Sequence, residues 1–181
     1  MSSGDTNSTT GDTDNSGTSS APVAGGTDDA MLAAAMVVDS VGSTSRRAAL
    51  GEAAANEIDR AERAQMTTAV LAHGGSIVDF TGDGAIALFP SSSAAISAAF
   101  ALCAPHYRIG IAVGEVRRDG TSWAGTPLVA ATALERRCPP GAVACSALTT
   151  RTASSAPPST SEPLPVADGT QSGDVVLRPA P

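Results

Sequence analysis

The chain contains no lysine, so its positive charge rests entirely on 11 arginines. The 18 acidic residues outnumber them and give a formal net charge of −7. Proteins that bind nucleic acids gather basic residues into a patch or stripe, and this sequence has no such stripe. We therefore expect no nucleic-acid partner.

Cysteine and long apolar runs are also scarce. The three cysteines are odd in number and show no CxxC spacing, which predicts reduced thiols rather than disulfides. No apolar stretch approaches the roughly 20 residues that a membrane span needs. The first residues also lack the basic and apolar regions of a signal peptide. These absences predict a cytoplasmic protein with no membrane partner.

The N-terminal segment, residues 1–30, contains little that a core could bury. It consists mainly of Ser, Thr, Gly and Asp, with five Asp and no arginine. Such a segment cannot offset the entropy cost of ordering, so we predict a disordered acidic leader. The remaining length suits one domain with a single core, which we place at 32–150. A Pro/Ser-rich tail, 151–181, follows and carries a candidate final edge strand at 174–181.

Hydrophobic patterning predicts an α+β fold. We expect a buried strand first, then one long helix with Ser43 or Thr44 as its N-cap and Gly74-Gly75 as its stop. A hairpin, a Ser-capped helix, a long strand, a polar loop, a helix and a strand follow. The corresponding ranges are 32–38, 45–73, 76–80, 85–89, 91–104, 107–116, 117–125, 126–137 and 139–146. This order suits a mostly antiparallel sheet with helices packed against it.

Two carboxylates lie at the ends of predicted apolar strands, Asp39 after the first strand and Asp83 in the hairpin turn. Neighbouring central strands of a ferredoxin-like sheet would bring these ends together. Facing carboxylates repel each other unless a cation lies between them, and hard oxygen ligands suit Mg²⁺ or Mn²⁺. Residues 41–44 offer free N–H groups at a helix N-terminus, where anions bind readily. The pattern predicts a nucleoside-triphosphate site, although each Asp alone also fits a turn or cap role.

Five stretches, taken together, resemble the catalytic domain of the class III adenylyl/guanylyl cyclases. They are MVVDSVGST (36–44), AHGGSIVDFTGDGAIALF (72–89), YRIGIAVGEV (107–116), WAGTPLVAATALERRCPPGAVACS (123–146) and VVLRPAP (175–181). They occur in the family's order over about residues 32–180. The resemblance implies a ferredoxin-like, palm-like sheet flanked by helices. It also implies a lyase that makes a cyclic nucleotide signal by attack of the ribose 3′-hydroxyl on the α-phosphate, with loss of pyrophosphate.

The resemblance further implies a site for two divalent metal ions, Mg²⁺ or Mn²⁺. Asp39 and Asp83 would be the metal ligands, with the backbone carbonyl of Ser40 as a third. The amides that would lie along the triphosphate are those of Val41, Gly42, Ser43 and Thr44. The family completes this site across a head-to-tail dimer.

The half-site that a partner subunit supplies in this family departs from the pattern. Its ribose-binding Asn and its transition-state Arg fall on Val129 and Ala133, and neither side chain can donate a hydrogen bond. Loss of one such donor typically costs about 10²–10³ in rate. Arg137, one helical turn beyond Ala133, is a weak candidate to replace the missing Arg.

The base-reading positions also differ. Asp79 replaces the family's Lys, and Ser122 stands at the partner position, an arrangement that resembles guanylyl cyclases. An acid can accept from guanine N1–H and the 2-amino group, and a hydroxyl can donate to O6. We therefore expect GTP rather than ATP, although Asp79 also fits an exposed acid on an alternating strand. Trp123, the only tryptophan, is expected at an interface or at the edge of a pocket.

Three functions are compatible with these residues. The chain is one half of a mixed dimer, in which another cyclase-type domain supplies the missing donors. Alternatively, it is a catalytically inactive pseudo-cyclase that regulates by binding nucleotide or a partner. The third reading is a self-sufficient homodimeric cyclase with altered base specificity.

Overall fold

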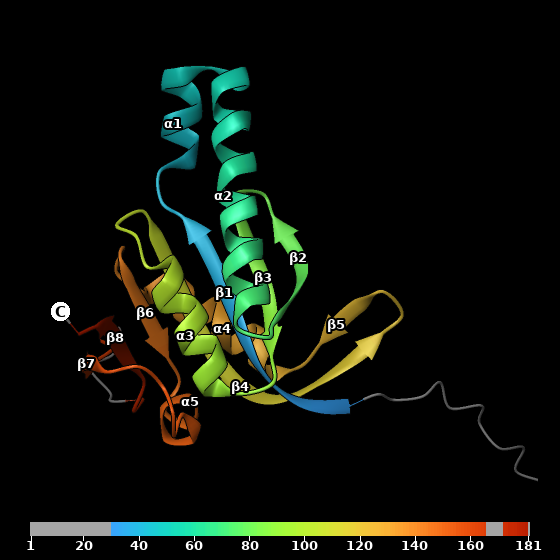
Figure 1. Cartoon of the computed structure of the whole chain (residues 1–181), viewed down its shortest axis with the longest axis vertical. Coiled ribbons are helices and arrows are strands. Elements are labelled where there is room, and N and C mark those ends of the chain that lie inside the picture. The colour runs from blue at the N-terminus through green and yellow to red at the C-terminus, as the bar shows by residue number, and fades with distance from the viewer. Residues whose placement is uncertain (1–29, 166–171, 181) are drawn as a thin grey trace, which may run out of the picture.

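One eight-stranded sheet organises the protein (Figure 1). The computed structural model describes residues 30–165 and 172–180, so all of the predicted acidic leader except Ala30 lies outside the described residues. The strand order is β2-β3-β1-β4-β6-β8-β7, and β5 pairs with β4. The β4–β6 pair is parallel and the other pairs are antiparallel. The predicted α+β class with a mostly antiparallel sheet is confirmed.

The elements alternate along the chain much as the patterning predicts. The strands are β1 (Ala30–Ser40), β2 (Ser76–Thr81), β3 (Gly84–Phe89), β4 (Tyr107–Asp119), β5 (Ser122–Ala124), β6 (Ala142–Cys145), β7 (Ser159–Pro163) and β8 (Val175–Pro179). The helices are α1 (Ser43–Leu50), α2 (Glu52–Ala72), α3 (Ser92–Leu102), α4 (Thr126–Arg137) and α5 (Ala147–Thr152).

Strand β1 lies at the centre and has a core on each side. Its side chains alternate between the two faces of the sheet, as the period of a strand requires. Ala34, Met36 and Val38 pack with α2 and α3, whereas the residues between them pack with α4. Figure 1 views the sheet from the side that α2 and α3 cover. A strand buried on both faces reads as a continuous apolar run, which is why β1 was predictable.

The single long helix predicted for residues 45–73 is wrong, because Gly51 divides it. Gly51 adopts φ 80° and ψ 165°, a conformation outside the helical region that glycine tolerates. The chain reverses there, and α1 lies beside α2 (Figure 1). The predicted Ser or Thr cap is also wrong: α1 begins at Ser43, and its N-cap is Gly42, without a side-chain cap. The predicted Ser cap of α3 is confirmed, since Ser91 Oγ accepts from the Ala94 N–H at 3.2 Å.

Two other expectations differ from the structure. The predicted polar loop at 117–125 is a β-hairpin, in which the end of β4 pairs with β5 and Arg117 faces Ala124. The final strand, β8, is not at the edge of the sheet, because β7 pairs on its outer side. Both errors have one cause, which is that short polar strands lack the apolar alternation that marks a strand in sequence.

Among the described residues, no helix combines the length and the apolar character needed to cross a membrane.

We expect Gly110→Ala to destabilise the fold, because α4 packs directly on the backbone of this residue. A Cβ at Gly110 would lie 2.1 Å from the Ala131 carbonyl oxygen and 2.4 Å from the Glu135 nitrogen. Overpacking of this kind typically costs about 1–3 kcal/mol, and urea unfolding measures it. Val129→Ala on the exposed side of the same helix is the control, and it should change the free energy of unfolding very little. Equal stability of both variants would contradict the packing argument.

Candidate functional site

The neighbouring ends of the interior strands β1 and β3 bring two acidic residues close together. The register between these strands runs to Val38 opposite Ala85. Asp39 follows Val38, and Asp83 precedes β3 by one residue. Gly84 permits the close approach, since a Cβ there would lie 2.2 Å from the Val38 carbonyl oxygen.

Asp83 sits in the two-residue turn that joins β2 to β3. The turn is possible because Gly82 takes a positive φ of 66°, which costs glycine little. Asp83 is half-buried, and within residues 30–165 and 172–180 no hydrogen bond or ion pair of the described side chains engages its carboxylate. A free carboxylate at a turn remains available to a cation.

Asp39 is engaged by an arginine on the neighbouring strand. Arg108 of β4 lies opposite Asp39 in the register, and its Nη2 donates to Asp39 Oδ2 at 2.5 Å. The Nε of the same guanidinium lies 3.1 Å from Glu135 Oε1 of α4. Burial raises the pKa of Glu135, the charge of Arg108 opposes the rise, and the charges of Asp39 and Asp83 add to it. Three carboxylates therefore influence one another here, with Arg108 in contact with two of them and the charge of Arg136 also acting on Glu135.

The N-terminus of α1 lies next to these acids and presents amide groups. The first N–H groups of a helix have no partner within the helix and carry partial positive charge. Gly42 accepts from the Arg46 N–H at 2.8 Å and so closes the first turn. The amide of Val41 was expected to be free for a phosphate, but its N–H already donates to the His106 carbonyl at 2.7 Å. The amides that remain for an anion are those of Gly42, Ser43 and Thr44.

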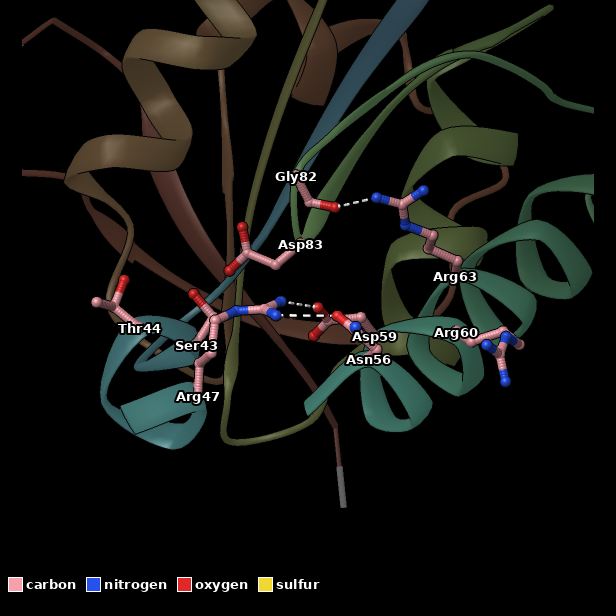
Figure 2. Close-up of a pocket in the computed structure, with 9 residues that line it drawn as sticks. All are labelled: Ser43, Thr44, Arg47, Asn56, Asp59, Arg60, Arg63, Gly82 and Asp83. Carbon is pink, nitrogen blue, oxygen red and sulfur yellow. Dashed lines mark hydrogen bonds and ion pairs between the residues drawn. The ribbon is translucent and has the colours of Figure 1, made fainter. Parts of the chain in front are cut away.

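A cleft of about 560 Å³ opens between α1, α2 and the β2–β3 turn (Figure 2). Its lining consists of Ser43, Thr44, Arg47, Asn56, Asp59, Arg60, Arg63, Gly82 and Asp83. Arg47 donates to Asn56 Oδ1 at 2.9 Å and also binds Asp59. Arg63 donates to the Gly82 carbonyl at 2.5 Å. These contacts join α1 and the Asp83 turn to α2, so α2 fixes the geometry of both.

The two predicted base-reading residues line a second cavity, of about 470 Å³, near β2 and β5. Asp79 and Ser122 lie there with Trp123 and the apolar side chains of Val78, Ile86 and Leu128. A β-bulge between Ile77 and Asp79 breaks the alternation of β2. It explains how two consecutive residues, Val78 and Asp79, reach one cavity. The prediction that Trp123 borders a pocket is confirmed.

Val129 and Ala133, which stand where hydrogen-bond donors were expected, lie on the outer face of α4. Val129 is 73% exposed, and Ala133, one turn further, is exposed as well. Arg137, the weak candidate for a replacement, donates to the Pro165 carbonyl at 2.9 Å, and its Nη1 lies 3.6 Å from Asp174. Its guanidinium is thus directed toward the segments around β7 and β8.

Solved structures share this arrangement of sheet and helices. An adenylate/guanylate cyclase/hydrolase from Silicibacter pomeroyi aligns with a TM-score of 0.66 and 25% identity, over 84% of this chain and 99% of that one. The protein has the class III nucleotidyl cyclase fold. The adenylyl cyclase CyaB from P. aeruginosa aligns with a TM-score of 0.68 and 18% identity, over 82% and 95%. The dimeric guanylyl cyclase domain of RhoGC from Blastocladiella emersonii aligns with a TM-score of 0.70 and 14% identity, over 82% and 97%.

The similarity spans nearly the whole of these cyclase domains, which agrees with the order of the five sequence stretches. No protein-family model matches the sequence, and the curated proteins give no significant match. The cyclase fold is therefore recognised through its structure and a few short motifs.

The acidic residues of this cyclase fold have the donor chemistry that Mg²⁺ or Mn²⁺ prefers. In the part of the chain that the structure describes, no three His, Cys, Asp or Glu side chains form a ligand group. Mg²⁺ commonly binds one or two carboxylates and retains water in its other positions. Two strand-end carboxylates therefore match the donor chemistry of such an ion.

Sequence reasoning missed Arg108 and Glu135. Arg108 is a single charged residue at the start of an apolar strand, and this isolated charge was the only sequence feature that marked the residue. Glu135 lies in a helix whose neighbouring residues are charged as well, so nothing in the sequence marks it as buried. Its 5% exposure depends on the packing of α4 over β4.

We expect the tyrosine of this chain to titrate abnormally late. Tyr107 pairs with Ser40 in the register, and burial, with the charge of Glu62 adding, raises its pKa to about 12. It is the only tyrosine, so the ultraviolet band of tyrosinate reports it alone. The unfolded chain ionises near 10, so this group's contribution to stability is present below pH 10 and is lost as the pH rises to about 12. A midpoint near 10 in the folded protein would contradict this.

Proposed function

We propose that the protein binds a nucleoside triphosphate with Mg²⁺ or Mn²⁺ and forms a cyclic nucleotide only with a complementing partner domain. The observation that supports this proposal is a pair of strand-end carboxylates in a chain whose α4 face lacks the expected donors. Asp39 and Asp83 lie at the neighbouring ends of β1 and β3, whereas Val129 and Ala133 occupy the exposed face of α4.

In this proposal, Asp39, Asp83 and the Ser40 carbonyl would hold two divalent ions, whose chemistry there would be to activate the 3′-hydroxyl and to neutralise the charge of the leaving pyrophosphate. The amides of Gly42, Ser43 and Thr44 bind phosphate oxygens at the N-terminus of α1. This part of the site requires only residues that the chain has.

Base recognition is assigned to the second cavity. Asp79 would accept from the N1–H and 2-amino group of guanine, and Ser122 would donate to O6. Support comes from their position in one cavity with Trp123, whose ring offers an apolar surface. We therefore propose GTP as the preferred substrate. One solved relative, the catalytic core of a rhodopsin-guanylyl cyclase with converted specificity, is in complex with ATPαS.

The partner is proposed to be another cyclase-type domain. Its role would be to present a ribose-orienting amide and a cationic donor to the Asp39–Asp83 half-site. Among the solved relatives, RhoGC from Blastocladiella emersonii has both a dimeric and a monomeric guanylyl cyclase domain structure. Exposure of Val129 and Ala133 agrees with a face that another domain covers.

A regulatory pseudo-cyclase is the second candidate. It is favoured by the engagement of Asp39 with Arg108 and by the absence of donor groups at positions 129 and 133. Such a protein would bind nucleotide, or a partner cyclase, without chemistry.

Measurement of cyclic product separates the candidates. The purified chain is incubated with Mn²⁺ and GTP or ATP, alone and with partner cyclase domains. We expect product only in a mixture, with GTP preferred, and its loss in Asp83→Asn. The carboxamide keeps the size of the side chain but removes the charge that holds the cation. Product from the chain alone would contradict the need for a partner, and nucleotide binding without product in any mixture would favour the regulator.

Restoring the missing donors should create activity in the chain alone. We expect Val129→Asn combined with Ala133→Arg to raise Mn²⁺-dependent product formation by at least about 10², because each donor typically contributes 10²–10³. Both positions are exposed, so the substitutions should not disturb the core. The same pair in an Asp83→Asn background is the control and should remain inactive. No gain in the folded double variant would mean that more than these two donors is missing.

A further inference from the structure

We propose that Glu135 is a positioning residue that, through Arg108, sets the affinity of Asp39 for a divalent cation. The inference rests on the proposed function, because it takes Asp39 to be a metal ligand. It assigns a role to Glu135 and Arg108, which have no role in the proposed chemistry.

The geometry places one guanidinium between two carboxylates. Arg108 donates from Nη2 to Asp39 Oδ2 at 2.5 Å, and its Nε lies 3.1 Å from Glu135 Oε1. Asp39 and Arg108 are directly opposite each other on β1 and β4, so sheet register fixes this pair. Glu135 approaches from α4 on one face of the sheet. The three residues therefore come from three elements.

Arg108 competes with a metal ion for the charge of Asp39. A carboxylate compensated by a guanidinium attracts a divalent cation less strongly, because the two positive charges repel each other. The cation must either share Asp39 with Arg108 or displace it. The strength of the contact between Arg108 and Asp39 therefore enters the metal affinity directly.

Glu135 determines how readily Arg108 breaks its contact with Asp39. The Glu135 side chain is 7% exposed, and within the described residues Arg108 is its only ion-pair partner. The contact between Nε and Oε1 is an ion pair without hydrogen-bond geometry. Because an uncompensated buried carboxylate is costly, the charge of Glu135 still attracts the guanidinium when Asp39 binds a cation. The helix backbone at Glu135 packs against Gly110 on the same strand as Arg108, which holds Glu135 in reach. Arg108 can thus release Asp39 without losing its position.

Without Glu135, Asp39 would be the sole carboxylate paired with Arg108, and the cation would have to break that pair. Without Arg108, Asp39 would carry a full uncompensated charge at the partly open end of β1. The two changes are expected to act in opposite directions on metal affinity. A merely structural role of the network would not produce opposite signs.

A double-mutant cycle on Mn²⁺ affinity tests the inference. The readout is the magnetic resonance signal of free Mn²⁺, titrated with the full chain without nucleotide, so no activity is needed. We expect Glu135→Gln to weaken Mn²⁺ binding about tenfold and Arg108→Met to tighten it by a similar factor. In the Arg108→Met background, Glu135→Gln should have little further effect, because its action runs through the guanidinium.

Three controls support the cycle. Arg118→Met, on the same strand but remote from Asp39, should leave Mn²⁺ affinity unchanged. Asp83→Asn should abolish binding and so identify the site that is measured. Thermal unfolding of each variant shows that it is folded, and Arg108→Gln replaces Arg108→Met in the cycle if the methionine variant does not fold.

The outcomes separate this inference from the proposed function. An equal loss of affinity from Glu135→Gln in both backgrounds would overturn the inference, since Glu135 would then act without Arg108, and would leave metal binding intact. Weaker binding in Arg108→Met would overturn it as well. If Mn²⁺ binds the Arg108→Met variant but not the native chain, Arg108 prevents the binding of Mn²⁺ in the native chain, and the inference is supported. Absence of Mn²⁺ binding in every variant would overturn both the inference and the metal half of the proposed function.

Discussion

The pairing of β1 with strands on both of its sides is the constraint on which the site depends. The register with β3 brings Asp39 near Asp83, and the register with β4 sets Arg108 opposite Asp39. A shift of one residue in either ladder would turn every side chain of β1 to the other face. The two cores, which use alternate residues of β1, forbid such a shift. Packing far from the acids therefore fixes their geometry.

Sequence alone predicted the elements that carry strong apolar patterns and the residues that short motifs mark. Strand β1, the β2–β3 hairpin and helix α4 were found, and Asp39 and Asp83 were correctly placed at neighbouring strand ends. The reversal at Gly51 was missed, because the alanine-rich sequence on both sides of it favours helix and one glycine costs only about 1 kcal/mol. The roles of Arg108 and Glu135 were beyond reach, since they depend on contacts between strands and helices that are far apart in the chain.

The residues of the proposed site come from different parts of the fold. Asp39 and Asp83 lie at the ends of β1 and β3, strands that contribute to both cores. Val129 and Ala133 lie on the outer face of α4, where they have little influence on packing. A surface helix can change its functional side chains while the interior stays intact. The fold therefore does not depend on which side chains occupy positions 129 and 133.

The edges of the sheet limit how two such domains can meet. All residues of β7 at one edge are exposed, and its last residue, Pro163, has no N–H to offer a neighbouring strand. At the other edge, β2 is interrupted by its bulge and carries the charge of Asp79. Edges of this kind resist strand-to-strand joining and aggregation. Two copies are therefore not expected to merge into one continuous sheet.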